Sequence, residues 1–306
     1  MQAPGRHAAV IADWKTGRVV RPSGSDAGVR GRVETVPETD TPEPGKLLET
    51  ARAAAAEAAQ LLVDGRPADL GVAQTKSSPT DVVTEMDTAA EKIIRAAIRR
   101  HRPDDAFLGE EGGSEQGGSG VRWVIDPIDG TVNYLYGLPA WAVSIGAEVD
   151  GATVAGVVLA PQLGEEYTAV LGEGAWLDGR RLAVRRPDGL AQALIATGFG
   201  YRAQRREVQG RIVAGLIGRV RDIRRGGSAA LDLCSVAAGR VDGYFERGTH
   251  PWDRAAGALV ATEAGAVVEG FHGAPASEAM VLAAGPGLFP ALHGALAALG
   301  ADEQGY

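Results

Sequence analysis

The segment with the clearest chemical signal is an apolar run that ends in two carboxylates three residues apart. Asp126 and Asp129 follow Trp123–Ile125, at the kind of strand end where a rigid backbone gives way to a functional loop. If both side chains turn toward one point, joined by the Ile128 carbonyl, they form a set of hard oxygen ligands that suits Mg²⁺. The alternative is a turn in which the aspartates cap backbone N–H groups.

Three further acidic positions extend this pattern to other parts of the chain. Glu110 comes directly after a short apolar run, Asp253 stands where a helix is expected to begin, and Asp87 lies near the start of another helical segment. Each also has an ordinary explanation, because acidic loops are often solvated and Asp is a good helix N-cap. Taken singly, each residue fits either explanation.

Two helices are expected in the N-terminal part of the chain, before the carboxylate motifs. The segment 47–63 is rich in Ala, Leu and Glu and predicts a helix, which a following Gly and Pro would end. A second helix is expected over 88–100, with Thr88 and Glu91 spaced as a capping box. Residues 1–45 offer little to bury, and their Pro-, Glu- and Thr-rich end predicts a disordered tail.

Two sheet-forming regions with different patterns follow. Residues 121–184 consist of short β-rich runs, and the hairpin dipeptides Asp150-Gly151 and Asp178-Gly179 predict an antiparallel sheet. Further along, strands and helices alternate, which is typical of an α/β arrangement. The expected strands are 194–197, 241–245, 266–268 and 280–284, and the expected helices are 205–217, 228–238, 253–264 and 288–299. We expect an α+β metal-binding domain over 46–186 and an α/β domain over 187–306 that completes the site.

The composition excludes several classes of protein. The 306 residues carry 31 Lys and Arg against 39 Asp and Glu, a net charge of −8, so nucleic-acid binding through bulk charge is not expected. The single Cys234 excludes an internal disulfide and a cysteine-based zinc site. No run reaches the ~18 apolar residues of a membrane span, and no secretory pattern is visible, so we expect a cytoplasmic protein that does not bind membranes. Arginine pairs are scattered as on solvated faces, with recruitment of a second phosphate by one pair as the alternative; the pairs are Arg180-Arg181, Arg185-Arg186, Arg205-Arg206 and Arg224-Arg225.

Four motifs in a fixed order give the sequence a family resemblance. They are the run Lys76–Thr84 with Asp87, then Gly109-Glu110-Glu111, then Asp126-Pro127-Ile128-Asp129-Gly130-Thr131, and finally Trp252-Asp253 with Ala256-Gly257. Together they resemble the inositol monophosphatase family of Mg²⁺-dependent, lithium-sensitive phosphatases, over roughly residues 47–285. The resemblance implies a layered α-β-α-β-α sandwich of the inositol monophosphatase and fructose-1,6-bisphosphatase type, and a homodimer.

The resemblance also implies a set of metal ligands. Glu110, Asp126 and the Ile128 carbonyl would bind one Mg²⁺, and Asp126, Asp129 and Asp253 would bind a second. A weaker third ion would depend on Glu110 through water. Such carboxylates suit phosphoryl transfer, which depends on cations at the phosphate oxygens and on in-line positioning.

The reacting water and the phosphate would have their own residues. By resemblance, Thr131 and Asp87 form the pair that orients and deprotonates the water, with Glu110 contributing to catalysis. The backbone N–H groups of Gly130 and Thr131 would receive the phosphate. Thr131 can pass a proton on only if Asp87 accepts it.

Substrate contacts are implied on the far side of the phosphate. Ser228, Ala229, Glu246 and His250 match positions near the sugar ring, and Asp129 would also contact the substrate. A carboxylate at Glu246 can accept hydrogen bonds from vicinal hydroxyls, which suits a polyol. The alternatives are a solvated Glu246 at a strand end, a His250 held only by packing, and Ser228 as a helix N-cap.

The resulting expectation is hydrolysis of a small polyol monophosphate, with myo-inositol 1-phosphate as the preferred substrate. The alternatives with the same mechanism are histidinol phosphate, fructose 1,6-bisphosphate and a 3′-phosphonucleotide. An alternative from another class is a regulatory protein that uses this fold without turnover. Loss of a metal carboxylate or of the Thr131–Asp87 pair would favour it, and all of these residues are present.

Overall fold

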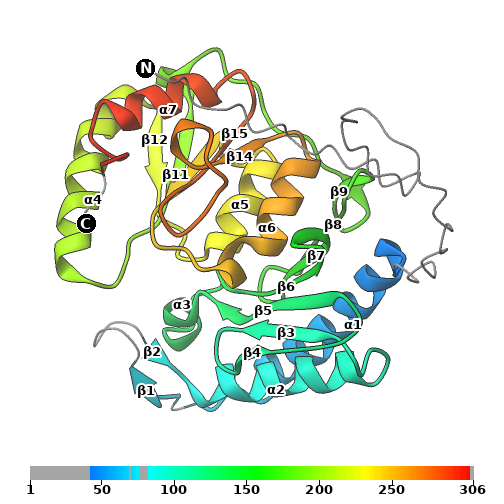
Figure 1. Ribbon diagram of the computed structural model, residues 1–306. Helices are drawn as coiled ribbons and strands as arrows, with labels where there is room; N and C mark the ends of the chain where they lie inside the picture. The colour runs from blue at the N-terminus through cyan, green and yellow to red at the C-terminus, as the bar shows by residue number, and fades with distance from the viewer. Residues whose placement is uncertain (1–41, 69, 76–81, 304–306) are drawn as a thin grey trace, which may run out of the picture. The chain divides into compact units, whose positions relative to one another are not determined.

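A computed structural model describes residues 42–68, 70–75 and 82–303, which belong to one compact unit of the chain (Figure 1). Residues 1–41, which make up most of the expected tail, lie outside the described residues, and so does the motif segment Lys76–Asp81. No helix of the described residues is long and apolar enough to cross a membrane.

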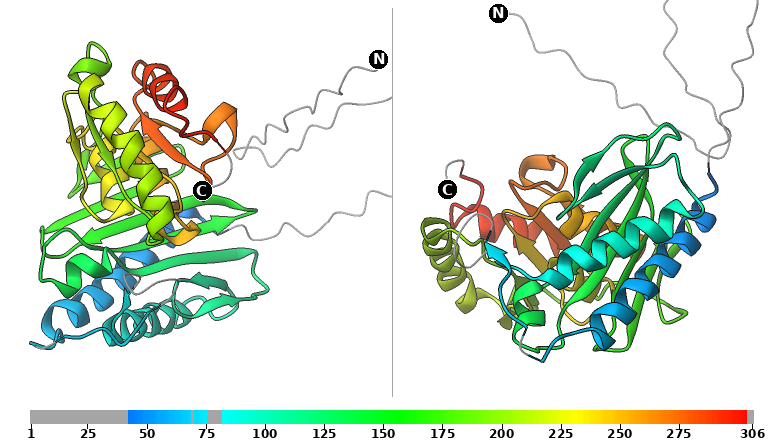
Figure 2. Two further views of the ribbon diagram at one scale, coloured as in Figure 1. Left: turned by 90° about the vertical axis from the view of Figure 1, so that its left-hand side faces the viewer. Right: turned by 90° about the horizontal axis from the view of Figure 1, so that it is seen from below.

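The elements of this unit form five layers in the order helices, sheet, helices, sheet, helices (Figure 1 and Figure 2). From the first helical layer to the last, the helices are α1 (Pro44–Asp64) with α2 (Glu85–Arg99), α5 (Ala229–Ala237) with α6 (Pro251–Glu263), and α4 (Ala203–Leu216) with α7 (Phe289–Ala297). Four clusters of buried apolar side chains fill the spaces between successive layers. The predicted α-β-α-β-α sandwich is therefore confirmed.

The larger sheet has eight strands in the order β10-β9-β8-β7-β6-β5-β3-β4. They are β3 (Ala106–Gly109), β4 (Gly113–Glu115), β5 (Val121–Asp129), β6 (Ala142–Val149), β7 (Ala152–Ala160), β8 (Glu165–Val170), β9 (Gly174–Leu177) and β10 (Arg180–Arg181). Neighbours from β5 to β10 are antiparallel, as predicted, whereas β3 runs parallel to β5. Asp150 and Asp178 adopt left-handed backbone with φ of 51° and 49°, as the predicted Asp-Gly hairpins require.

The smaller sheet has the order β12-β11-β13-β15-β14 and mixes parallel with antiparallel pairs. Its strands are β11 (Leu194–Thr197), β12 (Asp222–Arg224), β13 (Gly243–Glu246), β14 (Val267–Glu269) and β15 (Val281–Ala284). The predicted alternation of strands and helices is confirmed, but β12 was not predicted, because its short sequence carries two charges and little apolar pattern. Two short strands, β1 (Gln74–Thr75) and β2 (Val82–Val83), form a separate ladder.

Helix α2 begins three residues earlier than its predicted start. The capping box is Thr84 with Asp87, not Thr88 with Glu91: Thr84 Oγ1 accepts from the Met86 N–H at 3.2 Å, and Asp87 Oδ2 accepts from the Thr84 N–H at 2.8 Å. The Glu91 carboxylate instead accepts from the backbone N–H groups after β3. The true cap fixes the Asp87 side chain at the base of the helix, beside the end of β5.

Candidate active site

A one-residue bulge in β5 places the two central aspartates on the same side of the strand. Asp126 pairs with Ser144 of β6 and Asp129 pairs with Ala142, so three steps on β5 match two on its neighbour. Residues three apart in a regular strand point to opposite faces, and one extra residue restores them to the same face. Both side chains are buried, with 2% and 8% of their surface exposed.

Asp129 is held by the N-terminus of α5. Its carboxylate accepts from Ser228 Oγ at 2.5 Å, from the Ala230 N–H at 2.7 Å and from the Ala229 N–H at 3.3 Å. Ser228 is also the N-cap of α5, so its two predicted roles are combined in one residue. Burial raises the pKa of Asp129 to about 6, although these hydrogen bonds and the positive end of the helix oppose the shift.

Asp253 enters the site from the first turn of α6. The helix begins at Pro251, two residues before its predicted start, and the His250 N–H donates to Asp253 Oδ2 at 2.6 Å. Burial raises the pKa of Asp253 well above its usual range, and the Asp129 and Glu110 carboxylates add to the shift. The cap therefore orients Asp253, and only one of its oxygens is used for this purpose.

Glu110 is brought beside Asp126 by the parallel pairing of β3 with β5. Its backbone N–H donates to the Ile125 carbonyl at 3.2 Å, which extends the ladder one residue past β3. Burial, followed by the charge of Glu110, raises the pKa of Asp126, and the two side chains are hydrogen-bonded. Gly109 leaves room for the Glu91 carboxylate, because a Cβ on Gly109 would lie 2.1 Å from a Glu91 oxygen.

Thr131 begins the short helix α3 (Thr131–Leu135), which was not predicted. Its Oγ1 lies 3.1 Å from Asp87 Oδ1 and 3.0 Å from the Ile128 carbonyl. Gly130 before it has a φ of 97°, and a Cβ there would lie 3.0 Å from the Ala140 carbonyl, so only glycine fits this approach. Burial raises the pKa of Asp87 to about 6.

Glu246 ends β13 in a partly buried position. Its carboxylate accepts from the Tyr244 hydroxyl at 2.8 Å, and a Cβ on Gly198 would lie 1.9 Å from one of its oxygens. Burial raises the pKa of Glu246 to about 7. The alternative of a freely solvated strand end therefore does not apply. The exposed His250 ring stacks on Trp252 with 4.9 Å between centroids.

One cavity of about 510 Å³ brings most of the predicted residues together. Those that line it are Glu110, Asp126, Ile128, Asp129, Gly130, Thr131, Ala229, Glu246, His250 and Asp253. Asp87 and Ser228 do not line it, since Asp87 contacts it through Thr131 and Ser228 through Asp129. The cavity thus joins residues from both sheets and from the helices between them.

Sequence reasoning missed a second set of lining residues. They are the loop residues Gly198, Phe199, Gly200, Tyr201 and Arg202, together with Arg205, Arg225, Gly248 and Glu278. Gly227 and Trp252, which adjoin the predicted site residues Ser228 and Asp253, also line the cavity. Arg205 belongs to a pair that the sequence assigned to a solvated face, and this prediction is wrong for Arg205, whose Nε is buried. Arg225 lines the cavity and is exposed, as predicted. The repeated Gly-x-Gly at 198–200 was the available signal of a close backbone approach.

The donor chemistry of the cavity fits a hard divalent cation. No three His, Cys, Asp or Glu side chains of residues 42–68, 70–75 and 82–303 form a tight ligand cluster by themselves. Mg²⁺ commonly takes only one or two carboxylates and completes its shell with waters and phosphate oxygens, so a looser set suits it. Four carboxylates and one carbonyl face the same space, and their mutual repulsion would be relieved by a cation.

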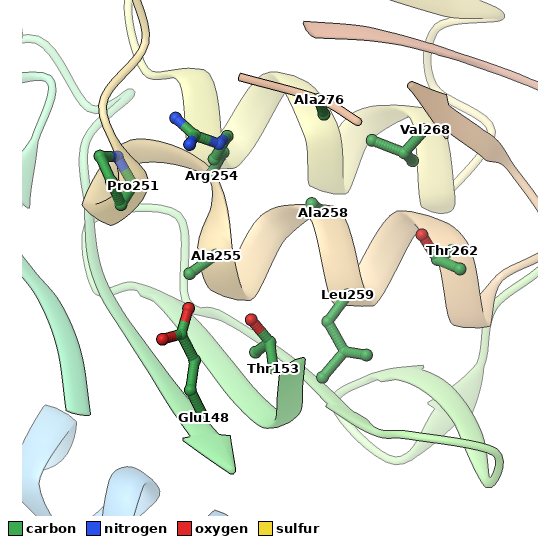
Figure 3. Close-up of a pocket in the computed structure, with 10 residues that line it drawn as sticks. All are labelled: Glu148, Thr153, Pro251, Arg254, Ala255, Ala258, Leu259, Thr262, Val268 and Ala276. Carbon is green, nitrogen blue, oxygen red and sulfur yellow. The ribbon is translucent and has the colours of Figure 1, made fainter. Parts of the chain in front are cut away.

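A second cavity of about 340 Å³ lies along the other side of α6 (Figure 3). Its charged lining residues are Glu148 and Arg254, which are already engaged: Glu148 accepts from Arg122, and Arg254 donates to the Thr249 carbonyl. It contains none of the predicted site residues.

Comparisons with known proteins identify the family of the chain. The profile of the inositol monophosphatase family matches residues 43–303. An inositol-1-monophosphatase SuhB from Mycobacterium tuberculosis H37Rv is 47% identical over 274 residues, which cover 83% of this chain and 94% of that protein. The Nus factor SuhB from Escherichia coli K12 is 42% identical over 229 residues, 74% of this chain and 86% of that protein. The solved structure of Mycobacterium tuberculosis SuhB superimposes with a TM-score of 0.73 at 45% identity and covers 85% of this chain and 99% of that one.

Proposed function

Because the chain belongs to the inositol monophosphatase family, a family of metal-dependent phosphatases, we propose that it hydrolyses myo-inositol 1-phosphate to inositol and phosphate. The observation that carries the proposal is a single cavity that holds four carboxylates beside the Thr131–Asp87 pair. Metal cations at the phosphate and a positioned base are the two requirements of phosphomonoester hydrolysis.

The proposed metal is Mg²⁺, with two or three ions. Glu110, Asp126 and the Ile128 carbonyl would hold one, Asp126, Asp129 and Asp253 a second, and Glu110 a weaker third through water. Bound Mg²⁺ supplies positive charge to the phosphate oxygens and lowers the pKa of the attacking water.

The chain's own contribution is proton transfer and orientation. Thr131 Oγ1 already donates to Asp87, so it can accept the proton of the attacking water while its own proton passes to Asp87. The water oxygen then bonds to phosphorus, the ester P–O bond breaks with its electron pair on the inositol oxygen, and that oxygen takes a proton from a solvent water. The raised pKa of Asp87 makes its carboxylate a better acceptor than an ordinary aspartate.

Ring recognition would fall to the residues around Glu246. Its carboxylate lies in the cavity wall with one oxygen bonded to Tyr244, which leaves acceptor capacity for vicinal hydroxyls. Ala229 and His250 line the same space, and the Gly130 and Thr131 N–H groups would bind the phosphate.

A phosphate-release panel with Mg²⁺ tests the substrate. It compares inositol 1-phosphate with histidinol phosphate, fructose 1,6-bisphosphate and a 3′-phosphonucleotide, the alternatives that keep the same mechanism. The proposal expects the highest kcat/KM for inositol 1-phosphate, and a higher value for any other substrate contradicts it.

A second candidate function is regulatory, because a relative from Escherichia coli K12 carries the name Nus factor SuhB. The complete set of carboxylates, with Thr131 and Asp87 beside it, argues against a purely non-catalytic role. Absence of phosphate release from every substrate of the panel would favour this candidate.

Three properties implied by the resemblance are proposals as well: a homodimer, inhibition by lithium and a cytoplasmic location. Light scattering after size exclusion tests the dimer. Phosphate release with and without LiCl at constant ionic strength tests lithium, and cell fractionation tests the location.

A further inference from the structure

The cavity contains an arginine, Arg205, that has no hydrogen-bond or ion-pair partner among the described residues. The Arg205 Nε is buried and makes no hydrogen bond, and no described residue forms an ion pair with Arg205 or Arg202. Both side chains line the cavity that holds the carboxylates. A buried polar atom without a partner costs free energy, and its persistence at a ligand cavity points to a partner supplied by the ligand.

The position of Arg205 is built by two glycines. A Cβ on Gly248 would lie 2.4 Å from Arg205 Nη1, and a Cβ on Gly200 would lie 2.6 Å from Arg205 Cδ. The preceding glycine of the same loop, Gly198, is covered by Glu246 instead. The loop 198–200 therefore contacts the Glu246 carboxylate, proposed to bind the ring, at Gly198 and the Arg205 side chain at Gly200.

Helix α4 adds positive charge at the same place. Its N-cap is Arg202, no side chain caps it, and its first turn contains no acidic residue. The free N–H groups and the positive end of this 14-residue helix favour an anion. The loop before it is fixed, because the Gly200 N–H donates to the Gln209 side chain at 2.9 Å.

Two other charged residues of the cavity wall, Arg225 and Glu278, do not contribute to anion binding beside Arg205. Arg225 already faces the charges of Glu246 and Asp232. Glu278 lines the cavity and its backbone carbonyl accepts from the Gly248 N–H, but its carboxylate forms no ion pair with Arg205 among the described residues.

We propose that Arg205 and Arg202, at the N-terminus of α4, form a second anion subsite that binds the distal phosphate of a polyol bisphosphate. This inference rests on the proposed function, since the first phosphate must occupy the carboxylate end of the same cavity. A guanidinium binds phosphate oxygens in pairs with directed hydrogen bonds, which suits recognition at a fixed distance from the reacting phosphate.

Two probe substrates that differ only in the second phosphate test the subsite. Phosphate release at C1 is measured with Mg²⁺ on fructose 1,6-bisphosphate and on fructose 1-phosphate, and the ratio of the two kcat/KM values is the preference. The wild type is expected to prefer the bisphosphate, and Arg205→Gln to lower that preference about tenfold, a factor that corresponds to ~1.4 kcal/mol. Arg205→Lys keeps the charge and is expected to lose less.

Arg206→Gln is the matched control, because Arg206 is the exposed neighbour on α4 and does not line the cavity. It is expected to leave the preference unchanged. Absence of any preference in the wild type, or an equal loss on both substrates in Arg205→Gln, overturns the subsite.

Calorimetry separates this inference from the proposed function. Binding of the two fructose phosphates to an Asp87→Asn protein, with and without Arg205→Gln, reports the subsite without depending on turnover. If the wild type fails to hydrolyse inositol 1-phosphate but Arg205→Gln weakens only bisphosphate binding, the proposed function fails and the subsite stands. If inositol 1-phosphate is hydrolysed and the two ligands bind equally, the subsite fails alone.

Discussion

Thr131 Oγ1 lies 3.1 Å from Asp87 Oδ1, although 44 positions separate the two residues in the chain. The other Asp87 oxygen accepts from the backbone N–H and the hydroxyl of Thr84, at 2.8 and 2.6 Å. The same carboxylate therefore caps α2 with one oxygen and faces the cavity, through Thr131, with the other. In the proposed mechanism, a proton taken up by Thr131 would pass to the Asp87 oxygen that faces it.

Asp87→Asn is expected to lower kcat by about 10²–10⁴-fold with little change in KM, because it removes the proton acceptor and keeps a polar helix cap. Thr131→Ala should cause a similar loss, and the double variant should lose little more than either single one, as residues that act as a unit do. Steady-state kinetics on inositol 1-phosphate measures all three. Losses that multiply in the double variant would contradict the pairing.

Asp126→Asn is expected to abolish Mg²⁺-dependent phosphate release and leave the fold intact. The variant removes a carboxylate that is 2% exposed and lies among Glu110, Asp129 and Asp253. Without metal, the Tm of the variant should equal or exceed that of the wild type, since a source of repulsion is lost. Near-normal turnover would disprove the metal assignment, and circular dichroism controls for folding.

The stability of the metal-free protein is expected to fall as the pH rises. Burial raises the pKa of Asp87 and Asp129 to about 6 and that of Glu246 to about 7, so the folded protein holds these protons more tightly than the unfolded chain. The resulting stability is complete below about pH 4 and is lost as the pH passes through 6 to 7.

For Asp129, a shift of about two units corresponds to at most ~3 kcal/mol. Calorimetric scans in EDTA should show a Tm lower by several degrees at pH 8 than at pH 4.5. Mg²⁺ should raise the Tm more at pH 8, where the carboxylates are charged. If the Tm of the metal-free protein increased from pH 4.5 to pH 8, the predicted direction of the pH dependence would be wrong.

Glu246→Ala is expected to raise the KM for inositol 1-phosphate about tenfold, because a charged acceptor for the ring hydroxyls is lost. The KM for a simple aryl phosphate, which offers no vicinal hydroxyls, should change by less than about twofold. Equal effects on both substrates would exclude Glu246 from ring binding. Glu269→Ala is the control, because Glu269 is a carboxylate on β14 of the same sheet and does not line the cavity.

Arg66 is expected to position Thr131 from the far end of α3. Its Nη2 donates to the Tyr134 and Leu135 carbonyls at 3.3 Å each, and its guanidinium lies 5.5 Å from the centre of the Tyr134 ring. Arg66→Met should lower kcat about tenfold with KM nearly unchanged. Loss of these hydrogen bonds would displace α3, and with it Thr131, but not the residues proposed to bind the ring. Arg122→Met, which breaks an exposed ion pair with Glu148, should leave kcat unchanged, and a matching loss there would refute the positioning role.

The sequence predicted which carboxylates line one cavity, because they stand in short, ordered motifs around Asp126 and Asp129. Their convergence depends on the extra residue between Asp126 and Asp129, which no periodic pattern reveals. The cap of α2 was predicted at Thr88 because Thr88 and Glu91 are spaced as a capping box. Thr84 and Asp87 have the same spacing, and only the tertiary contacts of Glu91 decide between the two pairs.

The arginines of the cavity illustrate a different difficulty. Arg205 stands beside Arg206 in an otherwise polar helix segment, and adjacent charges on a helix normally face solvent. Arg205 can turn inward because Gly200 and Gly248 have no side chains there, and Gly248 lies in the distant connection between β13 and α6. Such a space becomes visible only when distant segments are brought together.

The bulge in β5 also has a consequence for how this activity can be lost. If this segment kept its length but paired with β6 without the bulge, the two aspartates would stand three steps apart in an ordinary pleat, and their carboxylates would lie on opposite faces of the sheet. Every residue of the motif could then survive in a folded chain that no longer assembles a metal centre. Substitutions elsewhere that remove the bulge would therefore separate the two carboxylates with the whole motif retained, and counting motif residues would not reveal the change.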